Sequence, residues 1–394
     1  MMDLKSIKDI LRDFEPQLIQ IRRRLHTTPE LSFKEENTSA FIRSCLEEWG
    51  IPFSAGWAGY GLVGLVSGER APSNRVVALR ADMDALPITE DSGYPFPSQN
   101  NGVMHACGHD VHMACLLGAV YVLHRLRQDW GGKVKFLFQP GEEVLPGGAS
   151  LMIREGALQN PVPELILGLH VQPGLDVGKA GICPGPSMAS SDELYLEISG
   201  PGGHAAMPHL AADPVLAAAR IITGVQELMA RERPPMTPAV MGFGKLETIG
   251  GATNVIPARV KLEGTFRTLD PEFREKMHLR LDEFVRAIAD ASGAEAELKI
   301  NRGYPVLVND PLAAAKWLQF ASEYLGADSL AEIPPRLTAE DFAHYTRLIP
   351  GCFFRLGTGP SSNVHSPKFV ANDEAVPVGA GLLAWQAIRF LGNT

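Results

Sequence analysis

The first part of the chain alternates between helical and strand-like hydrophobic patterns. Apolar residues recur three or four positions apart over residues 1–26, which predicts an amphipathic helix. Further helices are predicted over 38–49, 110–127 and 148–155, and short apolar runs between them predict strands over 61–66, 75–80, 133–138 and 164–169. Nearly continuous apolar strands alternating with helices indicate a sheet that is buried on both faces and parallel at least in part.

The pattern changes near Ser187, where polar and apolar residues begin to alternate as in a half-buried strand. The order β-α-β-β-α-β follows, which is the split βαβ unit. Its predicted elements are strands over 192–199, 240–248, 259–268 and 295–300 and helices over 214–231 and 271–292. We therefore expect an inserted ferredoxin-like α+β domain over 187–300.

The segments on either side of this insertion both show helices alternating with apolar strands. Helices are predicted over 311–324 and 379–391, with a strand over 352–356 between them. We expect 1–186 and 301–394 to form one discontinuous α/β domain, with a mixed, largely parallel sheet flanked by helices.

Composition narrows the class of protein. The 394 residues are 45% hydrophobic and 21% charged, which is ordinary for a globular chain, and the net charge of −9 argues against nucleic acid or an anionic membrane as partner. The longest apolar run, Met113–Leu123, is too short to span a membrane. Early charges such as Asp3 and Lys5 leave no apolar signal-peptide stretch, and the five scattered cysteines fit free thiols. A cytoplasmic protein is the expectation.

The densest group of reactive side chains lies between His105 and His112. Three imidazoles, the thiol of Cys107 and the carboxylate of Asp110 fall within eight residues, and these are ligands for zinc and other transition metals. The alternative is a polar helix start with Asp110 near its N-cap.

Further candidates follow the predicted strands. Asp84 comes after strand 75–80, Glu142 and Glu143 after strand 133–138, and His170 at the end of strand 164–169. Alone, each has an ordinary interpretation, such as a solvated acidic turn or a structural histidine. Together they predict a site at the carboxyl edge of the sheet, where open α/β sheets bind ligands. The donors suffice for two ions and leave a carboxylate as general base.

Six motifs together resemble the M20 metallopeptidase family. They are Arg80–Pro87, His105–Asp110, Gly141–Glu143, Gly202–Ala205, Asn254–Pro257 and His365–Pro367. They are most similar to its amidohydrolase branch, which includes aminoacylases, hippurate hydrolases and auxin-conjugate hydrolases. The wider family has a His-x-Asp motif and a bridging Asp, whereas here Asp82 stands at the His position and Cys107 at the bridging one.

The resemblance implies a binuclear centre. Cys107 would bridge two divalent ions, with His109 and His170 completing one site and Glu143 and His365 the other; the assignment of the two pairs to ions stays open. Glu142 would be the general base, and Asp84 would orient a metal ligand. Zinc or manganese is expected, and cobalt or nickel also suits these ligands.

The resemblance also assigns residues of the inserted domain, which would be a lid or dimerisation domain. His204 would stabilise the oxyanion, in the same subunit or across a homodimer interface, although Gly202-Gly203 before it also fits a tight turn. Asn254 and Arg267 would hold the substrate carboxylate, although an arginine near a strand end is commonly solvated. A homodimer is expected, with a tetramer possible.

The function implied is hydrolysis of the amide bond of N-acetyl, N-benzoyl or similar N-acyl amino acids by a metal-activated water. A dipeptidase or carboxypeptidase with the same chemistry is the first alternative, with a short peptide as substrate. A non-catalytic metal-binding protein is the second, and it predicts the loss of the base or of a ligand, none of which is missing.

Overall fold

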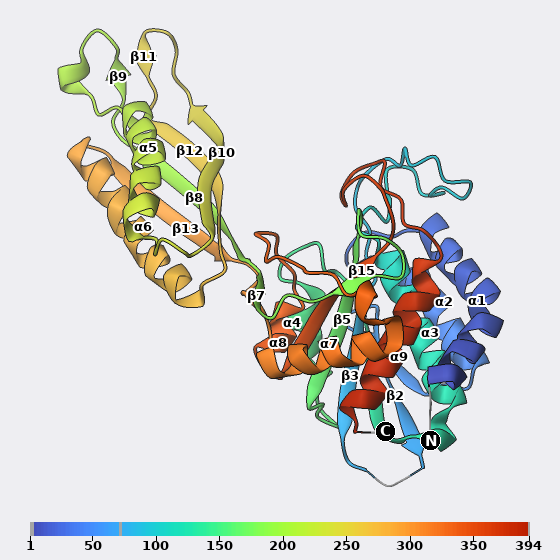
Figure 1. Ribbon diagram of the computed structural model, residues 1–394. Helices are drawn as coiled ribbons and strands as arrows, with labels where there is room; N and C mark the ends of the chain where they lie inside the picture. Colours follow the sequence, from blue (N-terminus) through green and yellow to red (C-terminus); the bar gives the residue numbers. More distant parts are fainter. Residues whose placement is uncertain (1–3, 71–72, 393–394) are drawn as a thin grey trace. The chain divides into compact units, whose positions relative to one another are not determined.

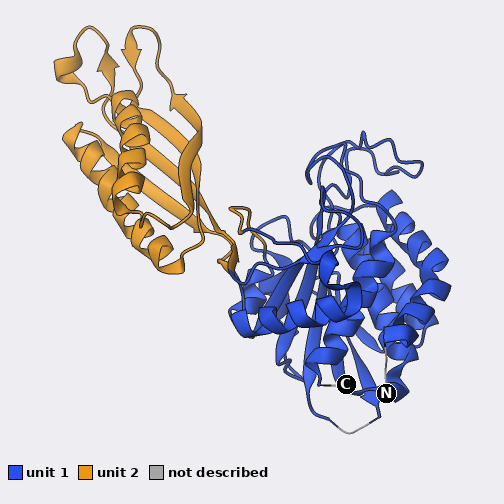
Figure 2. Cartoon of the chain, in the orientation of Figure 1, with its two compact units in different colours: residues 1–185, 308–334, 341–394 blue, residues 186–307, 335–340 orange. Residues whose placement is uncertain are grey.

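The structure is a computed structural model that describes residues 4–70 and 73–392. The chain divides into two compact units (Figure 2). Unit 1 comprises Met1–Gly185, Val308–Pro334 and Asp341–Thr394, and unit 2 comprises Pro186–Leu307 and Pro335–Glu340. The predicted first helix is α1 (Leu4–Thr27); residues 1–3 of that prediction lie outside the described part.

Unit 1 is built on a seven-stranded mixed sheet (Figure 1). The order is β1 (Phe53–Trp57), β2 (Gly61–Glu69), β4 (Gly131–Gln139), β3 (Val76–Asp82), β5 (Leu165–Gln172), β15 (Gly351–Gly357) and β6 (Ala180–Gly181). The four central strands β4, β3, β5 and β15 are parallel, and the outer pairs are antiparallel. The carboxyl ends of four neighbouring strands therefore meet at one edge.

Helices cover this sheet. Their bounds are α2 (Glu36–Glu48), α3 (His109–Arg125), α4 (Gly148–Arg154), α7 (Pro311–Leu325), α8 (Ala343–Thr346) and α9 (Ala375–Phe390). Helices α1, α3 and α9 pack against one another, and α4 packs against α8 and β4. Every residue of β3 and β15 is buried, as expected for strands covered on both faces.

Unit 2 has its own hydrophobic core beneath a four-stranded antiparallel sheet. The chain order is β8 (Ser190–Ser199), α5 (Pro214–Glu232), β10 (Ala239–Ile249), β12 (Arg259–Thr268), α6 (Pro271–Ala291) and β13 (Glu295–Arg302), with spatial order β10-β12-β8-β13. This is the split βαβ arrangement. Short strands pair as β9 (Gly203–His204) with β11 (Val255–Ile256), and β7 (Gly185–Met188) with β14 (Leu307–Asn309).

Three helices begin at an Asp-Pro pair, a start that can be read from the sequence. The side chains of Asp213, Asp270 and Asp310 cap α5, α6 and α7 by accepting backbone N–H groups of the first turn. Each following proline occupies a position where no backbone donor is needed.

Two of the differences from the predicted boundaries concern α9 and unit 2. Helix α9 begins at Ala375 rather than Gly379, because Pro377 lies in its first turn, where it is tolerated. Unit 2 extends to Leu307 and includes Pro335–Glu340, rather than ending at residue 300. The returning segment joins by backbone pairing, since Arg336 N donates to Ser187 O over 2.9 Å. Such long-range pairing leaves no periodic signal.

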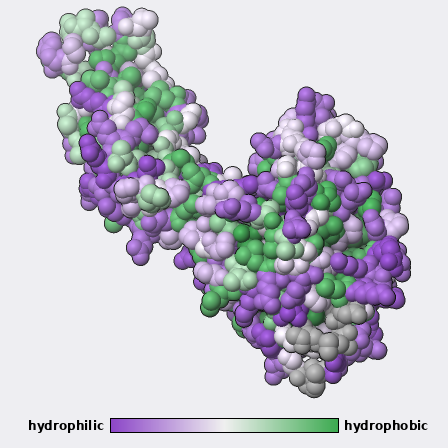
Figure 3. Space-filling view, in the orientation of Figure 1, coloured by the Kyte–Doolittle hydropathy of each residue, from purple (hydrophilic) through white to green (hydrophobic). Residues whose placement is uncertain are grey.

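No helix within residues 4–70 and 73–392 is long and apolar enough to cross a membrane. Hydrophilic residues dominate the visible surface of each unit, with hydrophobic ones between them (Figure 3). The exposed hydrophobic side chains of unit 2 include Leu210, Met236, Val240, Leu246 and Leu279.

Helix α6 offers a matched test of the unit 2 core. Leu281 is fully buried, whereas Leu279 is 70% exposed. We expect Leu281→Ala to lower the free energy of unfolding of unit 2 by about 2–5 kcal/mol, because it leaves a cavity. Leu279→Ala should change it by less than about 0.5 kcal/mol. Native-state hydrogen exchange of unit 2 amides measures both, and equal effects would contradict the described packing.

Candidate metal centre

The carboxyl edge of the parallel strands gathers the predicted acidic residues. Strand β3 ends at Asp82 and β4 at Gln139, so Asp84 and the pair Glu142-Glu143 follow neighbouring parallel strands. His170 is placed differently from the prediction, since β5 continues to Gln172 and His170 lies within it.

Of five groups of potential ligand atoms in the described residues, two share Cys107. Cys107, His109 and His170 place one ligand atom each within 4.8 Å of one another, and so do Cys107, Glu143 and His365. The Cys107 thiol lies 3.4 Å from His170 Nε2, and His365 Nε2 lies 3.2 Å from Glu143 Oε1. Both groups contain Cys107, so the five predicted ligand residues form one cluster around a shared sulfur.

A glycine between two of these residues is required by the backbone. Gly108 lies between Cys107 and His109, has a φ of +80° and is the N-cap of α3. A Cβ at this position would approach the Val171 side chain to 2.6 Å. Only glycine fits here without strain, and it allows the thiol and the imidazole to turn toward the same point.

The hydrogen bonds of two neighbouring histidines indicate which nitrogen of each imidazole carries the proton. His170 Nδ1 donates to Val171 O over 2.8 Å, which leaves Nε2 as a free lone pair facing Cys107. His112 Nε2 accepts from Val171 N over 3.0 Å, so its Nδ1 carries the proton and donates to Asp82 Oδ1 over 2.6 Å. His170 can therefore bind a metal, whereas both nitrogens of His112 are occupied.

The cluster has a strongly negative potential. Burial disfavours the charged form of His109, but Asp82, Asp84 and Glu143 outweigh it and raise its pKa to about 10. Burial raises the pKa of the Cys107 thiol well above its usual value, and the carboxylates of Glu143 and Glu142 raise it further. A thiolate at this position therefore needs a cation beside it.

The residues fit a metal in one further respect. His109 Nδ1 lies 3.3 Å from Asp84 Oδ1, while its buried Nε2 has no hydrogen-bond partner in the described part of the chain. Nε2 lies 4.0 Å from Glu143 Oε1. A buried imidazole nitrogen without a partner, next to a thiol and a carboxylate, belongs to the donor set of a transition-metal site, where a bound cation would take the place of the proton.

A buried charge network lies directly behind the cluster. Arg80 donates to Asp82 Oδ2 over 2.5 Å and to Asp341 Oδ1 over 2.6 Å. Asp341 Oδ2 also accepts from Gln139 Nε2 and Ala149 N. Although burial raises the pKa of Asp82, the nearby His109 and Arg80 outweigh it and hold that pKa well below its usual value. The network fixes the strand ends that present the cluster.

Asp110 is a buried ion-pair partner rather than a helix cap. Its Oδ2 lies 2.8 Å from Arg22 Nε and 2.8 Å from His26 Nδ1, both on α1. Sequence reasoning missed Arg22 and His26, although charged residues within the apolar stripe of a helix are a usable signal. His105 is in neither group around Cys107; burial lowers its pKa to about 4.

The remaining predicted residues belong to unit 2. His204 and Asn254 are exposed and close together, because β9 pairs with β11 and Ala205 N donates to Asn254 O over 3.0 Å. Arg267 is not with them. It lies eight residues along β12 from the end next to Asn254, about 27 Å at the rise of a strand, and donates to Leu337 O.

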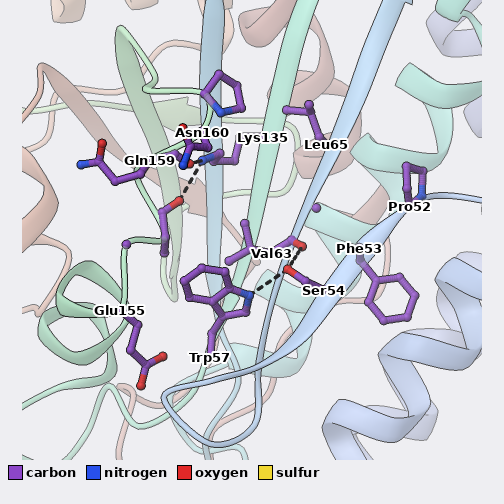
Figure 4. Close-up of a pocket in the computed structure, with 14 residues that line it drawn as sticks. Pro52, Phe53, Ser54, Trp57, Val63, Leu65, Lys135, Glu155, Gln159 and Asn160 are labelled. Carbon is purple, nitrogen blue, oxygen red and sulfur yellow. Dashed lines mark hydrogen bonds between the residues drawn. The ribbon is translucent and has the colours of Figure 1, made fainter.

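A hollow of about 600 Å³ lies elsewhere in unit 1, between β1, β2, β4 and the segment after α4 (Figure 4). Trp57 and Ser54 line it, with the Trp57 indole donating to Ser54 Oγ. Lys135 is buried at the edge of the hollow. Its ammonium group donates hydrogen bonds to Ala157 O and Gln159 O, which compensate for its loss of contact with water. None of the predicted site residues lines this hollow.

A sheet that gathers thiol, imidazole and carboxylate groups at its carboxyl edge defines an α/β protein with a candidate metal centre. A family model described as peptidase family M20/M25/M40 matches residues 78–385. The chain belongs to this family, which confirms the predicted resemblance.

Two curated relatives and one solved structure illustrate the similarity. N-acetyl-L-cysteine deacetylase of Bacillus subtilis is 39% identical over 97% of this chain and 90% of its own. N-acyl-L-amino acid amidohydrolase of Geobacillus stearothermophilus is 38% identical over 78% of this chain and 82% of its own. The solved YXEP protein of B. subtilis, described as a dinuclear metal binding peptidase from the M20 family, has a TM-score of 0.85 and 35% identity, covering 97% of this chain and 100% of that one. The predicted α/β fold is thereby confirmed.

The charge network predicts a large effect of one buried aspartate. Asp341→Ala should lower the free energy of unfolding by about 3–5 kcal/mol, because it leaves Arg80 partly uncompensated in the interior. Asp176→Ala is the control: Asp176 is 69% exposed and pairs with Lys179 at the surface, which contributes less than about 1 kcal/mol. Urea unfolding measures both, and similar values would contradict a structural role for the network.

Proposed function

We propose that the protein hydrolyses the amide bond of N-acyl amino acids with two divalent metal ions. The observation that carries this proposal is the pair of ligand groups that share Cys107. Cys107, His109 and His170 would hold one ion, and Cys107, Glu143 and His365 the other. The names of the two curated relatives, a deacetylase and an amidohydrolase, support the reaction class.

When bound, such ions lower the pKa of water and polarise a carbonyl oxygen. Zinc suits the thiolate and imidazole ligands best, and manganese, cobalt and nickel are compatible with the donor set. Asp84 supports the centre by holding His109, since its Oδ1 lies 3.3 Å from His109 Nδ1.

Glu142 is the proposed general base. Its side chain is only 6% exposed, and its Oε1 lies 3.4 Å from the Asp341 backbone N–H, next to the ligand Glu143. In this position the carboxylate takes a proton from the attacking water and returns it to the nitrogen of the leaving amine. Because Glu142 is buried, few bulk water molecules can compete for hydrogen bonds to its carboxylate.

Residues of unit 2 have proposed roles in substrate binding and catalysis. His204 is the proposed oxyanion donor and Asn254 a substrate ligand, and their proximity supports a common role. Arg267 is distant from both within one chain, so a substrate carboxylate bound by Arg267 and Asn254 together needs two copies. We therefore propose a homodimer, with a tetramer as the larger alternative, and the exposed hydrophobic side chains of unit 2 support association.

The cysteines support a proposed cellular location. All five are buried and no disulfide joins them within the described residues, which supports a reducing compartment, and we propose the cytoplasm.

A peptidase of the same family is the second candidate. The solved YXEP structure is described as a peptidase, which favours this candidate. The two functions use the same centre and differ in whether the substrate presents an acyl group or a free α-amine.

A substrate panel distinguishes the candidates. Metal-stripped protein refilled with zinc or manganese should release free amino acid from N-acetyl or N-benzoyl substrates faster than from dipeptides. Glu142→Gln should lower kcat about 10²–10⁴-fold, because it removes the base. Glu164→Gln, at a half-exposed glutamate paired with Arg75, should leave kcat unchanged. Faster cleavage of dipeptides would favour the peptidase, and full activity of Glu142→Gln would contradict the assigned base.

The ligand groups predict metal stoichiometry. His170→Ala and His365→Ala should each retain one ion after dialysis against dilute chelator, because each removes a ligand from a different group. Cys107→Ala should weaken both sites, because its sulfur belongs to both. Metal analysis by mass spectrometry measures the content per chain. Two ions retained by Cys107→Ala would contradict the shared thiolate.

A further inference from the structure

The segment between α1 and α2 lies beside the candidate metal centre, although no predicted site residue comes from it. Leu31 forms a backbone bridge with Ala85, and Ala85 N donates to Glu30 O over 2.8 Å. The segment therefore lies alongside the residues that come directly after β3. Among its next residues, Phe33 and Glu35 contact the turn that bears Glu142 and Glu143, and Ser32 contacts Asp84.

Glu35 fixes the first residue of that turn. Its side chain is fully buried, and its Oε1 accepts the Gly141 N–H over 2.8 Å. Gly141 has a φ of +62°, and its own carbonyl accepts from Gly148 N over 2.9 Å. Gly141 directly precedes Glu142. The hydrogen bond from Gly141 N to Glu35 therefore fixes the backbone position of the proposed base.

Ser32 fixes the other end of the turn through Asp84. Ser32 Oγ donates to Asp84 Oδ2 over 2.6 Å, and the same oxygen accepts the Glu143 N–H over 2.9 Å. The other oxygen, Oδ1, faces His109. Ser32 therefore holds the carboxylate that orients one proposed ligand and the backbone of another.

Phe33 packs against the turn between these two hydrogen bonds. A Cβ on Gly141 would meet the Phe33 ring at 2.4 Å, so the ring packs directly on the glycine. Phe33 itself has a φ of +61°, an uncommon backbone conformation for a bulky residue. Such strain persists only where surrounding contacts impose it, and it is concentrated at functional sites.

We propose that Ser32 and Glu35 are positioning residues that hold the Gly141–Glu143 turn in the geometry its two carboxylates need. The proposal rests on the proposed function, because it takes Glu142 as base and Glu143 as ligand. Neither Ser32 nor Glu35 belongs to the ligand groups, so both act through the turn.

The state of Glu35 suggests a conservative variant. Burial and the neighbouring Asp84 raise the pKa of Glu35 to about 7, so its neutral form is well populated near neutral pH. Glutamine has the same shape, is uncharged and keeps an acceptor oxygen for Gly141 N. Glu35→Gln should therefore preserve the positioning contact, whereas Glu35→Ala removes it.

The test compares Glu35→Ala, Glu35→Gln and Ser32→Ala with Glu48→Ala, an exposed control on α2. Zinc binding to metal-stripped protein is measured by calorimetry, and kcat and KM are measured on the best N-acyl substrate. Glu35→Ala and Ser32→Ala should each weaken zinc binding or lower kcat by about 10–100-fold, the usual effect of losing a supporting contact. Glu35→Gln should stay within about threefold of the unaltered protein, and Glu48→Ala should match it.

Two results would overturn the proposal. One is wild-type zinc affinity and kcat in both Glu35→Ala and Ser32→Ala. The other is an equal loss in Glu35→Gln and Glu35→Ala, because the acceptor oxygen would then be irrelevant. Melting temperatures identify misfolding of Glu35→Ala, and in that case Ser32→Ala, which removes only a hydroxyl, decides.

Failure of the proposed function has a different signature. If the unaltered protein binds zinc but cleaves no N-acyl substrate, the function fails. Zinc affinities of the variants still decide whether the segment positions Glu143.

Discussion

The carboxylates at the end of β3 have to be balanced by cations in an interior that excludes water. Asp82 and Asp84 are almost fully buried, and isolated buried charges are very costly. Arg80 and His112 donate hydrogen bonds to Asp82. Ser32 and Glu143 N donate to Asp84, and His109 Nδ1 lies next to its other oxygen. Because these partners come from β3 itself, α3, the segment after α1 and the turn after β4, this balance fixes these parts relative to one another.

The same constraint separates three histidines that look equivalent in the sequence. His112 is held between Asp82 and Val171 N, so it acts as a neutral spacer. His109 has one nitrogen facing Asp84 and the other facing the cluster. His105 is buried and belongs to neither ligand group around Cys107. Metal-ligating capacity therefore depends on which nitrogen is already engaged, a property that residue spacing does not encode.

Much of the fold could be predicted from the sequence because periodicity and capping are local. The Asp-Pro helix starts, the apolar strands of unit 1 and the alternating strands of unit 2 all have such signals. Strand β1 was missed, since its residues are mostly exposed and Gly56 interrupts it. The segment over 335–340 groups with unit 2 rather than with the segments around it, because its partners, such as Ser187 and Arg267, are at least 70 residues away in the sequence.

Prediction of the site was limited in the same way. The proposed ligands occur in dense motifs, whereas Glu35, Ser32 and Asp341 are single polar residues whose partners are distant along the chain. Their importance depends on burial and on one or two hydrogen bonds each. The separation of Arg267 from Asn254 follows from the length of β12, because Asn254 precedes this strand and Arg267 lies near its far end.

We propose that two metal ions in unit 1 would share the Cys107 thiolate. Anomalous X-ray scattering from crystals of the zinc-loaded protein, measured at the zinc absorption edge, distinguishes one ion from two. We expect two peaks, one next to His109 and His170 and the other next to Glu143 and His365, with Cys107 Sγ contacting both. A single peak, or two peaks of which only one contacts Cys107, would contradict the shared thiolate.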